Sequence, residues 1–178
     1  MSLTPVLLGL GSNVQREQHL CAALELLSEI LFEMQCSPVF ESEAVGYRGD
    51  HFFNLVVSGQ CALSLAELNA RLKKIEQDNG RYAPDRVGLP LDVDILSFGE
   101  QVGVFDGISL PRGEILKNAF VLWPLALLVP EQRHPQDGRT YAQLWQALSI
   151  DQHLWPVAMQ WRGQDLTPAS LLAPGHVS

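Results

Sequence analysis

Two stretches of this chain repeat leucine or isoleucine every three or four residues, and this spacing constrains the fold more than any other feature. It places the apolar side chains on one face of a helix. The first stripe comprises Leu20, Leu24, Leu27 and Leu31, and the second comprises Leu65, Leu68, Leu72 and Ile75. Each predicted helix therefore needs an apolar surface to pack against, and the short apolar runs around it are candidates for the strands of a sheet.

Those short apolar runs predict four strands, at residues 6–12, 36–47, 52–58 and 91–97. Pro38 marks the second strand as an edge strand or an irregular one, because proline cannot donate a ladder hydrogen bond. The order strand, helix, strand, strand, helix, strand is typical of the ferredoxin-like α+β fold. We therefore predict that fold class.

Local signals predict where the helices begin and end. Asn13 is a good N-cap for the first helix, and Ser64 with Glu67 forms a capping box at the start of the second. Gly80, after Asn79, is a left-handed C-terminal cap. The later part of the chain predicts a turn at 106–107, a short helix after 110–111, an apolar segment at 120–129, a helix over 141–148 and a strand within 154–161.

Length and charge limit the class of protein. A chain of 178 residues fits one domain, which we place at 1–150, with 151–178 as a partly ordered extension of it. The content of 47% hydrophobic and 18% charged residues indicates a globular chain. Twelve Lys and Arg against 20 Asp and Glu give a formal net charge of -8 without a basic stripe. This argues against nucleic acid or an anionic membrane as a partner.

Cysteine and histidine usage points to the cytoplasm. Three cysteines without a C-x-x-C pair argue against a disulfide framework or a zinc ribbon, and the five histidines lack metal-ligand spacing. The chain opens without a basic leader or cleavage site, and its longest apolar run, 119–130, is too short to span a bilayer. We expect a cytoplasmic monomer or weak dimer without membrane association.

The clearest chemical feature is an acidic pair inside the fourth predicted strand. Side chains alternate along a strand, so Asp92 and Asp94 share one face, roughly 7 Å apart, while Val93 points into the core. Two carboxylates placed in this way can each ligate Mg²⁺, with water and phosphate oxygens completing the shell. An exposed strand face carrying two acids explains an isolated Asp-x-Asp equally well, but their mutual repulsion favours a metal.

Three weaker patterns accompany this pair. Phe52 and Asn54 share one face of the third strand, which suits stacking and hydrogen bonding to a planar heterocycle as well as a core phenylalanine beside an edge amide. Residues 11–13, Gly-Ser-Asn, fit a phosphate-binding turn or a simple capped turn. Cations gather around the end of the second helix, where they could hold a polyphosphate or only complement the helix dipole: Arg71, Lys73, Lys74, Arg81 and Arg86.

Taken together, these features resemble the 6-hydroxymethyl-7,8-dihydropterin pyrophosphokinase family, folate-pathway enzymes that transfer diphosphate from ATP to a pterin alcohol. The resemblance covers roughly residues 5–148. The matching motifs, in chain order, are Leu10-Gly-Ser-Asn13, Phe52-Phe-Asn54, Ile75-Glu76 with Gly80-Arg81, Leu91-Asp-Val-Asp-Ile95, Pro111, Phe120-Val-Leu-Trp-Pro-Leu125 and Pro130-Glu131. Several spaced motifs in the right order are far more specific than any one alone.

The resemblance implies a fold and a set of site residues. It implies a three-layer fold in which helices flank an antiparallel sheet, and two Mg²⁺ ions held by Asp92 and Asp94. It places near ATP the residues Lys73, Glu76, Arg81, Ile95 and Arg112. It gives pterin binding to Ser42, Val45, Gly46, Phe52, Asn54, Asp94 and Phe120. The cationic side chains that would act in catalysis are then Arg81, Arg86 and Arg112.

The sequence also departs from the family pattern at three positions. Leu89 stands where the family has an arginine before its acidic motif, Arg112 replaces a histidine, and Asn118 replaces another arginine. Three hypotheses follow. The chain is a divergent pterin pyrophosphokinase, or an impaired or differently specific relative that binds a pterin or nucleotide in the same cleft, or an interaction module without catalysis. We favour the first.

Overall fold

A six-stranded antiparallel sheet forms the centre of the computed structural model, which describes residues 2–44 and 49–172. Its strands are β1 (Thr4–Ser12), β2 (Leu31–Cys36), β3 (Val39–Ser42), β4 (Phe52–Cys61), β5 (Asp92–Phe98) and β8 (Leu154–Val157). The spatial order is β5-β1-β4-β3-β8, and β2 also pairs with β4. All of these pairings are antiparallel, which confirms the predicted α+β class.

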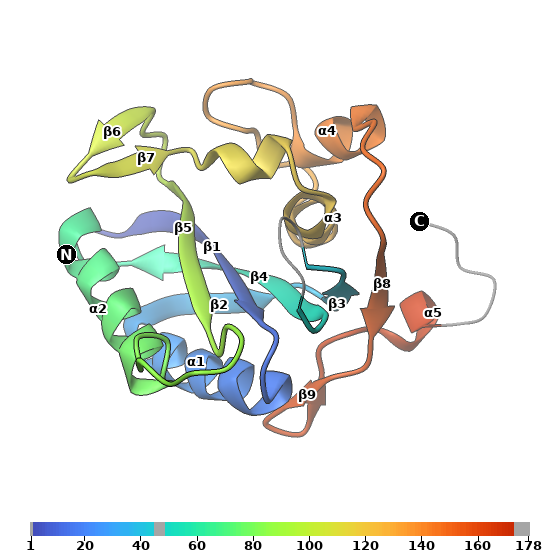
Figure 1. Ribbon diagram of the computed structural model, residues 1–178. Coiled ribbons are helices and arrows are strands. Elements are labelled where there is room, and N and C mark those ends of the chain that lie inside the picture. Colours follow the sequence, from blue (N-terminus) through green and yellow to red (C-terminus); the bar gives the residue numbers. More distant parts are fainter. Residues whose placement is uncertain (1, 45–48, 173–178) are drawn as a thin grey trace.

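Helices cover both faces of this sheet (Figure 1). One face carries α1 (Arg16–Ile30) and α2 (Leu65–Asp78), and the other carries α3 (Ala119–Leu128) and α4 (Tyr141–Ala147). The smaller elements are the hairpin β6 (Gly103–Phe105) with β7 (Ile108–Leu110), the 3₁₀-helix η1 (Gly113–Leu116), the hairpin β9 (Gln160–Trp161) with β10 (Gln164–Asp165), and α5 (Ala169–Leu172). The three-layer arrangement is therefore confirmed. Within the described ranges, every helix is too short or too polar to cross a membrane.

Strand alternation divides the core between the two helical layers. On β4, Phe53 and Leu55 pack with α1 and α2, whereas Val56 packs with α3 and α4. On β5, Val93 and Ile95 lie in the first core and Leu96 lies in the second. Residues on the α3 side that are not needed for packing are thereby free to line a cleft.

The second helix follows its predicted caps, but the first does not. Ser64 and Glu67 form the complete capping box of α2, and Gly80 takes the left-handed conformation with φ 85°. The predicted N-cap of the first helix is wrong, because α1 begins at Arg16 after Gln15. The Asn13 side chain instead accepts the N–H of Leu89 at 2.6 Å, a contact 76 residues away.

The predicted strand over 36–47 is also wrong in its bounds. The last leucine of the first stripe, Leu31, already belongs to β2, where it pairs with Cys61. Pro38 then separates β2 from β3, which ends at Ser42. Cross-strand pairing with β4 therefore overrides the helical spacing at Leu31.

The chain after α4 adds to the same sheet. Strand β8 pairs with β3 in the register Val39 with Val157 and Ser42 with Leu154. Beyond it, Arg162 forms a two-pronged ion pair with Glu25 of α1 at 2.8 and 2.7 Å. The segment from 154 to 162 is thus anchored at the sheet edge and on the first helical layer.

The free energy of unfolding should fall at acidic pH, because the loop between α3 and α4 contains a buried histidine, His134. His134 is 2% exposed, and its Nδ1 accepts the N–H groups of Gln136 and Asp137 at 3.2 and 3.0 Å. Burial lowers the pKa of His134. The unfolded chain therefore takes up the proton first as pH falls below about 6.5, so this contribution is full above that pH and is lost below it.

The test is urea denaturation of the wild type and of His134→Asn at pH 7.5 and pH 5.5. Asparagine keeps an acceptor for the two N–H groups and does not titrate, so its stability should drop less between the two pH values. An equal drop in both proteins would show that His134 is not the source.

Candidate active site

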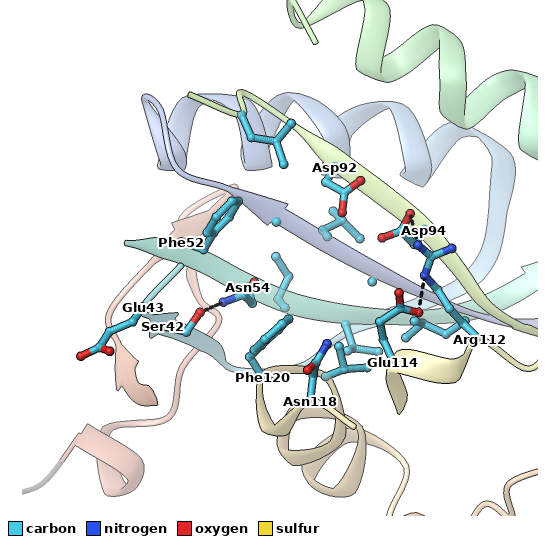
Figure 2. Close-up of a pocket in the computed structure, with 18 residues that line it drawn as sticks. Ser42, Glu43, Phe52, Asn54, Asp92, Asp94, Arg112, Glu114, Asn118 and Phe120 are labelled. Atoms are coloured by element: carbon cyan, nitrogen blue, oxygen red, sulfur yellow. Dashed lines mark hydrogen bonds and ion pairs between the residues drawn. The ribbon is translucent and has the colours of Figure 1, made fainter. Parts of the chain in front are cut away.

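A cleft of about 230 Å³ opens on the sheet face that carries α3 (Figure 2). Half of the residues predicted for the site line this cleft: Ser42, Phe52, Asn54, Asp92, Asp94, Arg112 and Phe120. They come from β3, β4, β5, α3 and the segment between β7 and η1. The structure therefore gathers residues that lie up to 78 positions apart, from 42 to 120, around one space.

Two glycines form the floor between the acidic and aromatic sides of the cleft. Gly11 on β1 lies opposite Asp92 on β5 and opposite Asn54 on β4. A Cβ at Gly11 would come within 3.3 Å of Asn54 Oδ1 and 3.7 Å of the Phe52 ring. Gly9 lies in the same way opposite Asp94. The absence of side chains at these two positions of β1 leaves space above the sheet.

The acidic side is the pair predicted from strand alternation. Asp92 and Asp94 line the cleft, while Val93 between them is buried in the core. Burial, and after it the neighbouring charge of Asp92, raises the pKa of Asp94 to about 8. The protein groups around the two aspartates thus do not fully stabilise both ionised carboxylates, and a bound cation would do so. The carboxylate oxygens suit Mg²⁺, so the residues present fit this ion.

The carboxylates available to a metal are few. Within residues 2–44 and 49–172, no cluster of three or more His, Cys, Asp or Glu side chains could hold a metal ion. Asp92 and Asp94 provide two carboxylates at the cleft, and water or substrate oxygens could complete the ligands of a bound Mg²⁺.

Arg112 lies beside the acidic pair. Its Nη2 is 3.6 Å from Asp94 Oδ1, and its Nε is 2.9 Å from Glu114 Oε2. The backbone N–H of Arg112 donates to Leu96 O at 2.8 Å, which fixes this segment against β5. The guanidinium therefore stands at the edge of the cleft, where Glu114 offsets part of its charge.

Arg81 reaches the acidic pair from the other direction. Its Nη1 donates to Asp92 Oδ1 at 2.9 Å, to Leu91 O at 3.0 Å and to Glu76 Oε2 at 3.1 Å. Glu76 is fully buried and also accepts the N–H of Val93 at 2.9 Å. The buried carboxylate thus ties α2 to β5 and orients Arg81 toward Asp92.

The aromatic side has two phenylalanines and an amide. Phe52 extends from β4 and Phe120 from the first turn of α3, with Asn54 between them in Figure 2. Asn54 Nδ2 donates to Ser42 Oγ at 2.8 Å in a buried hydrogen bond. The amide is therefore held in one orientation between two rings, which suits a flat heterocycle.

Several predicted site residues do not line the cleft. Glu76 and Ile95 are buried, with Ile95 in the core on the opposite face of the sheet, and Arg81 reaches only its acidic edge. Lys73 pairs with Glu76 at 3.6 Å. Arg86 is exposed and donates to Gly88 O. The predicted pterin contacts Val45 and Gly46 lie outside the described residues.

All three departures from the family pattern, Leu89, Arg112 and Asn118, line the cleft. Leu89 and Asn118 both contribute side chains to its wall. The Leu89 backbone is fixed by Asn13, whose N–H also donates to Leu89 O at 3.0 Å. The cleft therefore has an apolar and an amide side chain where the pattern has two arginines.

The comparisons decide the family. The model of the 7,8-dihydro-6-hydroxymethylpterin-pyrophosphokinase (HPPK) family matches residues 7–130. The chain belongs to this family. A 2-amino-4-hydroxy-6-hydroxymethyldihydropteridine pyrophosphokinase of Pseudomonas aeruginosa is 37% identical over 152 residues, covering 82% of this chain and 93% of that protein. One of the same name from Aquifex aeolicus is 33% identical over 136 residues, covering 75% and 85%.

Solved structures of the HPPK family share the fold. A crystal structure of Plasmodium falciparum HPPK-DHPS A437G with STZ-DHP has a TM-score of 0.66 and 14% identity. The match covers 82% of this chain and 45% of that one, so the present chain spans less than half of its length. Among the three hypotheses, the family match favours the pyrophosphokinase over the impaired relative and the interaction module.

Sequence reasoning missed part of the HPPK cleft. Gly11 is predicted only as part of a turn at 11–13, and Gly9 is not among the predicted site residues. Both could have been assigned to the cleft from the alternation that placed the aspartates, because they lie on the face of β1 opposite Leu8 and Leu10. Glu43 and Glu114 line the cleft as well, but no pattern in the sequence marks them.

Proposed function

We propose that the cleft binds 6-hydroxymethyl-7,8-dihydropterin between Phe52 and Phe120 and the phosphates of ATP beside Asp92 and Asp94. The enzyme would transfer diphosphate from ATP to the pterin hydroxyl, giving AMP and the pterin diphosphate for folate biosynthesis. Membership of the HPPK family supports this activity. One observation supports placing the pterin at one end and the phosphates at the other. The aromatic and amide residues line the cleft on one side of Gly11, and the acidic residues line it on the other side.

The pterin end would select a flat ring with hydrogen-bonding edges. The Phe52 and Phe120 rings offer apolar faces for stacking. The Asn54 amide, oriented by Ser42, would read the polar edge of the heterocycle. Binding at this end places the hydroxymethyl group toward the acidic side.

The acidic end would hold the polyphosphate. Asp92 and Asp94 would hold Mg²⁺, two ions by the family resemblance, and the bound metal would neutralise phosphate charge. Arg81 and Arg112 already contact these aspartates. Their guanidinium groups are thus placed to donate to phosphate oxygens as well.

The transfer itself requires little covalent work from the protein. The pterin hydroxyl oxygen would form a bond to the β-phosphorus of ATP, and the bond from that phosphorus to the oxygen bridging to the α-phosphate would break. AMP would leave, and the hydroxyl proton would pass to water. Catalysis is then a matter of holding the two substrates in line and compensating charge. We assign the charge compensation to Arg81, Arg86 and Arg112, and we propose that Lys73 lies near the nucleotide. Ile95 lies in the core on the other face of the sheet, and the buried Glu76 would act through Arg81.

The direct assay combines purified protein, ATP, Mg²⁺ and 6-hydroxymethyl-7,8-dihydropterin and follows AMP. We expect stoichiometric AMP and pterin diphosphate. Pterin binding by calorimetry without AMP at high enzyme concentration would instead favour the impaired relative. Absence of both binding and turnover would contradict the proposed function.

Restoring the two arginines should raise turnover. Leu89 and Asn118 line the cleft. Leu89→Arg with Asn118→Arg would add two cations there, and a single charge-assisted contact in a transition state is worth on the order of tenfold or more. Steady-state kinetics against ATP would measure this. An unchanged kcat and KM in the folded double variant would mean that other cations already meet the need.

The proposal also covers the location, the oligomeric state and the partners of the enzyme. We propose a cytoplasmic monomer or weak dimer that acts on small molecules without nucleic acid, and light scattering of the purified protein would check its oligomeric state. We also propose that residues 151–178 extend the domain of 1–150, supported by the pairing of β8 with β3.

A further inference from the structure

The side chain of Gln152, in the segment between α4 and β8, contacts the first residues of α3. Its Oε1 accepts the N–H of Ala119 at 2.6 Å, and its Nε2 donates to Asn118 Oδ1 at 3.2 Å. Asn118 is the N-cap residue of α3, and Phe120 is the second residue of that helix. One distant side chain therefore holds both the cap and the first turn of α3.

This contact replaces a local cap. An asparagine at the N-cap position ordinarily accepts an N–H from the first turn of its own helix. The Asn118 side chain makes no such bond. Gln152 provides the acceptor instead, from 33 residues further along the chain. The orientation of the first turn of α3 thus depends on a segment outside residues 7–130, which the family model matches.

The same segment borders the aromatic end of the cleft. Leu154, two residues after Gln152, pairs with Ser42, and Ser42 orients Asn54. A second cavity, lined by Gln152, Ser42 and Phe120 among others, adjoins the cleft at this point. Gln152 therefore acts on the end of the cleft that carries Phe120, away from the acidic pair.

We propose that Gln152 is a positioning residue for pterin binding, because it fixes Asn118 and the first turn of α3 and thereby places the Phe120 ring. The inference rests on the proposed function, since it concerns the pterin end of the same cleft. It predicts a selective effect on the pterin, because Asp92 and Asp94 lie on β5 and Asp92 is held by Arg81, at the other end of the cleft.

The experiment removes the two hydrogen bonds while keeping the side-chain length. Gln152→Met should weaken pterin binding about tenfold in calorimetry and raise the KM for the pterin by a similar factor, with the KM for ATP changed less than about twofold. Gln152→Ala removes the same bonds with a different volume, so an effect seen in both variants does not arise from packing. Urea denaturation would verify that each variant is folded.

Rescue and control variants separate positioning from general damage. Gln152→Glu keeps an acceptor for the Ala119 N–H, and the Asn118 amide can turn to donate to it, so pterin binding should return close to that of the wild type. Gln146→Met, on the exposed side of α4, should have no effect. If both Gln152→Met and Gln152→Ala bind the pterin with wild-type affinity, the role of Gln152 is overturned, but the proposed function is not. A wild type that binds no pterin would overturn the proposed function.

Discussion

Replacing Asp94 by asparagine should lower the rate of AMP release on the order of 10³-fold while leaving the protein folded. The substitution removes one of the two carboxylates that face the cleft from β5. Charge stabilisation of this kind is commonly worth two to three orders of magnitude in rate, about 3–4 kcal/mol. Because burial and the charge of Asp92 disfavour the Asp94 carboxylate, its neutralisation should not lower the free energy of unfolding.

The measurement pairs turnover with folding. AMP release and urea denaturation would be followed for Asp94→Asn and for the control Asp78→Asn, an exposed residue of α2 whose carboxylate pairs with Lys74. The control should keep wild-type turnover. Full activity in Asp94→Asn would exclude this carboxylate from catalysis, and a large loss of stability would show that its role is mainly structural.

The second large effect is on stability. Glu76→Ala should reduce the free energy of unfolding by about 3 kcal/mol, because it leaves the buried N–H of Val93 without its acceptor and removes a buried partner of the Arg81 guanidinium. Tyr82, whose hydroxyl donates to Glu76 Oε1 at 2.7 Å, would lose a partner as well. The effect should exceed that of an ordinary surface substitution several-fold.

Graded variants would test this assignment by urea denaturation. Tyr82→Phe removes one hydrogen bond to Glu76 and should cost about 1 kcal/mol. Glu29→Ala, on the exposed side of α1, should stay within about 0.5 kcal/mol of the wild type. A Glu76→Ala protein as stable as the wild type would mean that water replaces the carboxylate at no cost.

The parts of the site that could be predicted are those set by local geometry. Alternation along a strand depends only on neighbouring residues, so the sequence suffices to place Asp92 with Asp94 on one face of β5 and Phe52 with Asn54 on one face of β4. Capping is equally local, and the capping box at Ser64 is present as predicted. The fold class followed from the order of these elements.

What could not be predicted depends on partners far away in the chain. Asn13 has the residue type of a helix cap, yet it binds the backbone of Leu89. Leu31 continues a helical stripe, yet its pairing with Cys61 draws it into a strand. No spacing in the sequence links Gln152 to Ala119, since that hydrogen bond exists only once the segment before β8 lies against the start of α3.

The pairing of β8 with β3 has a consequence for shortening the protein. A chain cut after residue 150 would retain the motifs at Asp92, Asp94 and Phe120, but it would uncover the hydrogen-bonding groups of β3 from Val39 to Ser42. An uncovered strand of this kind can pair with another chain. Strand β8 therefore protects β3 against self-association at the side where the aromatic half of the cleft lies.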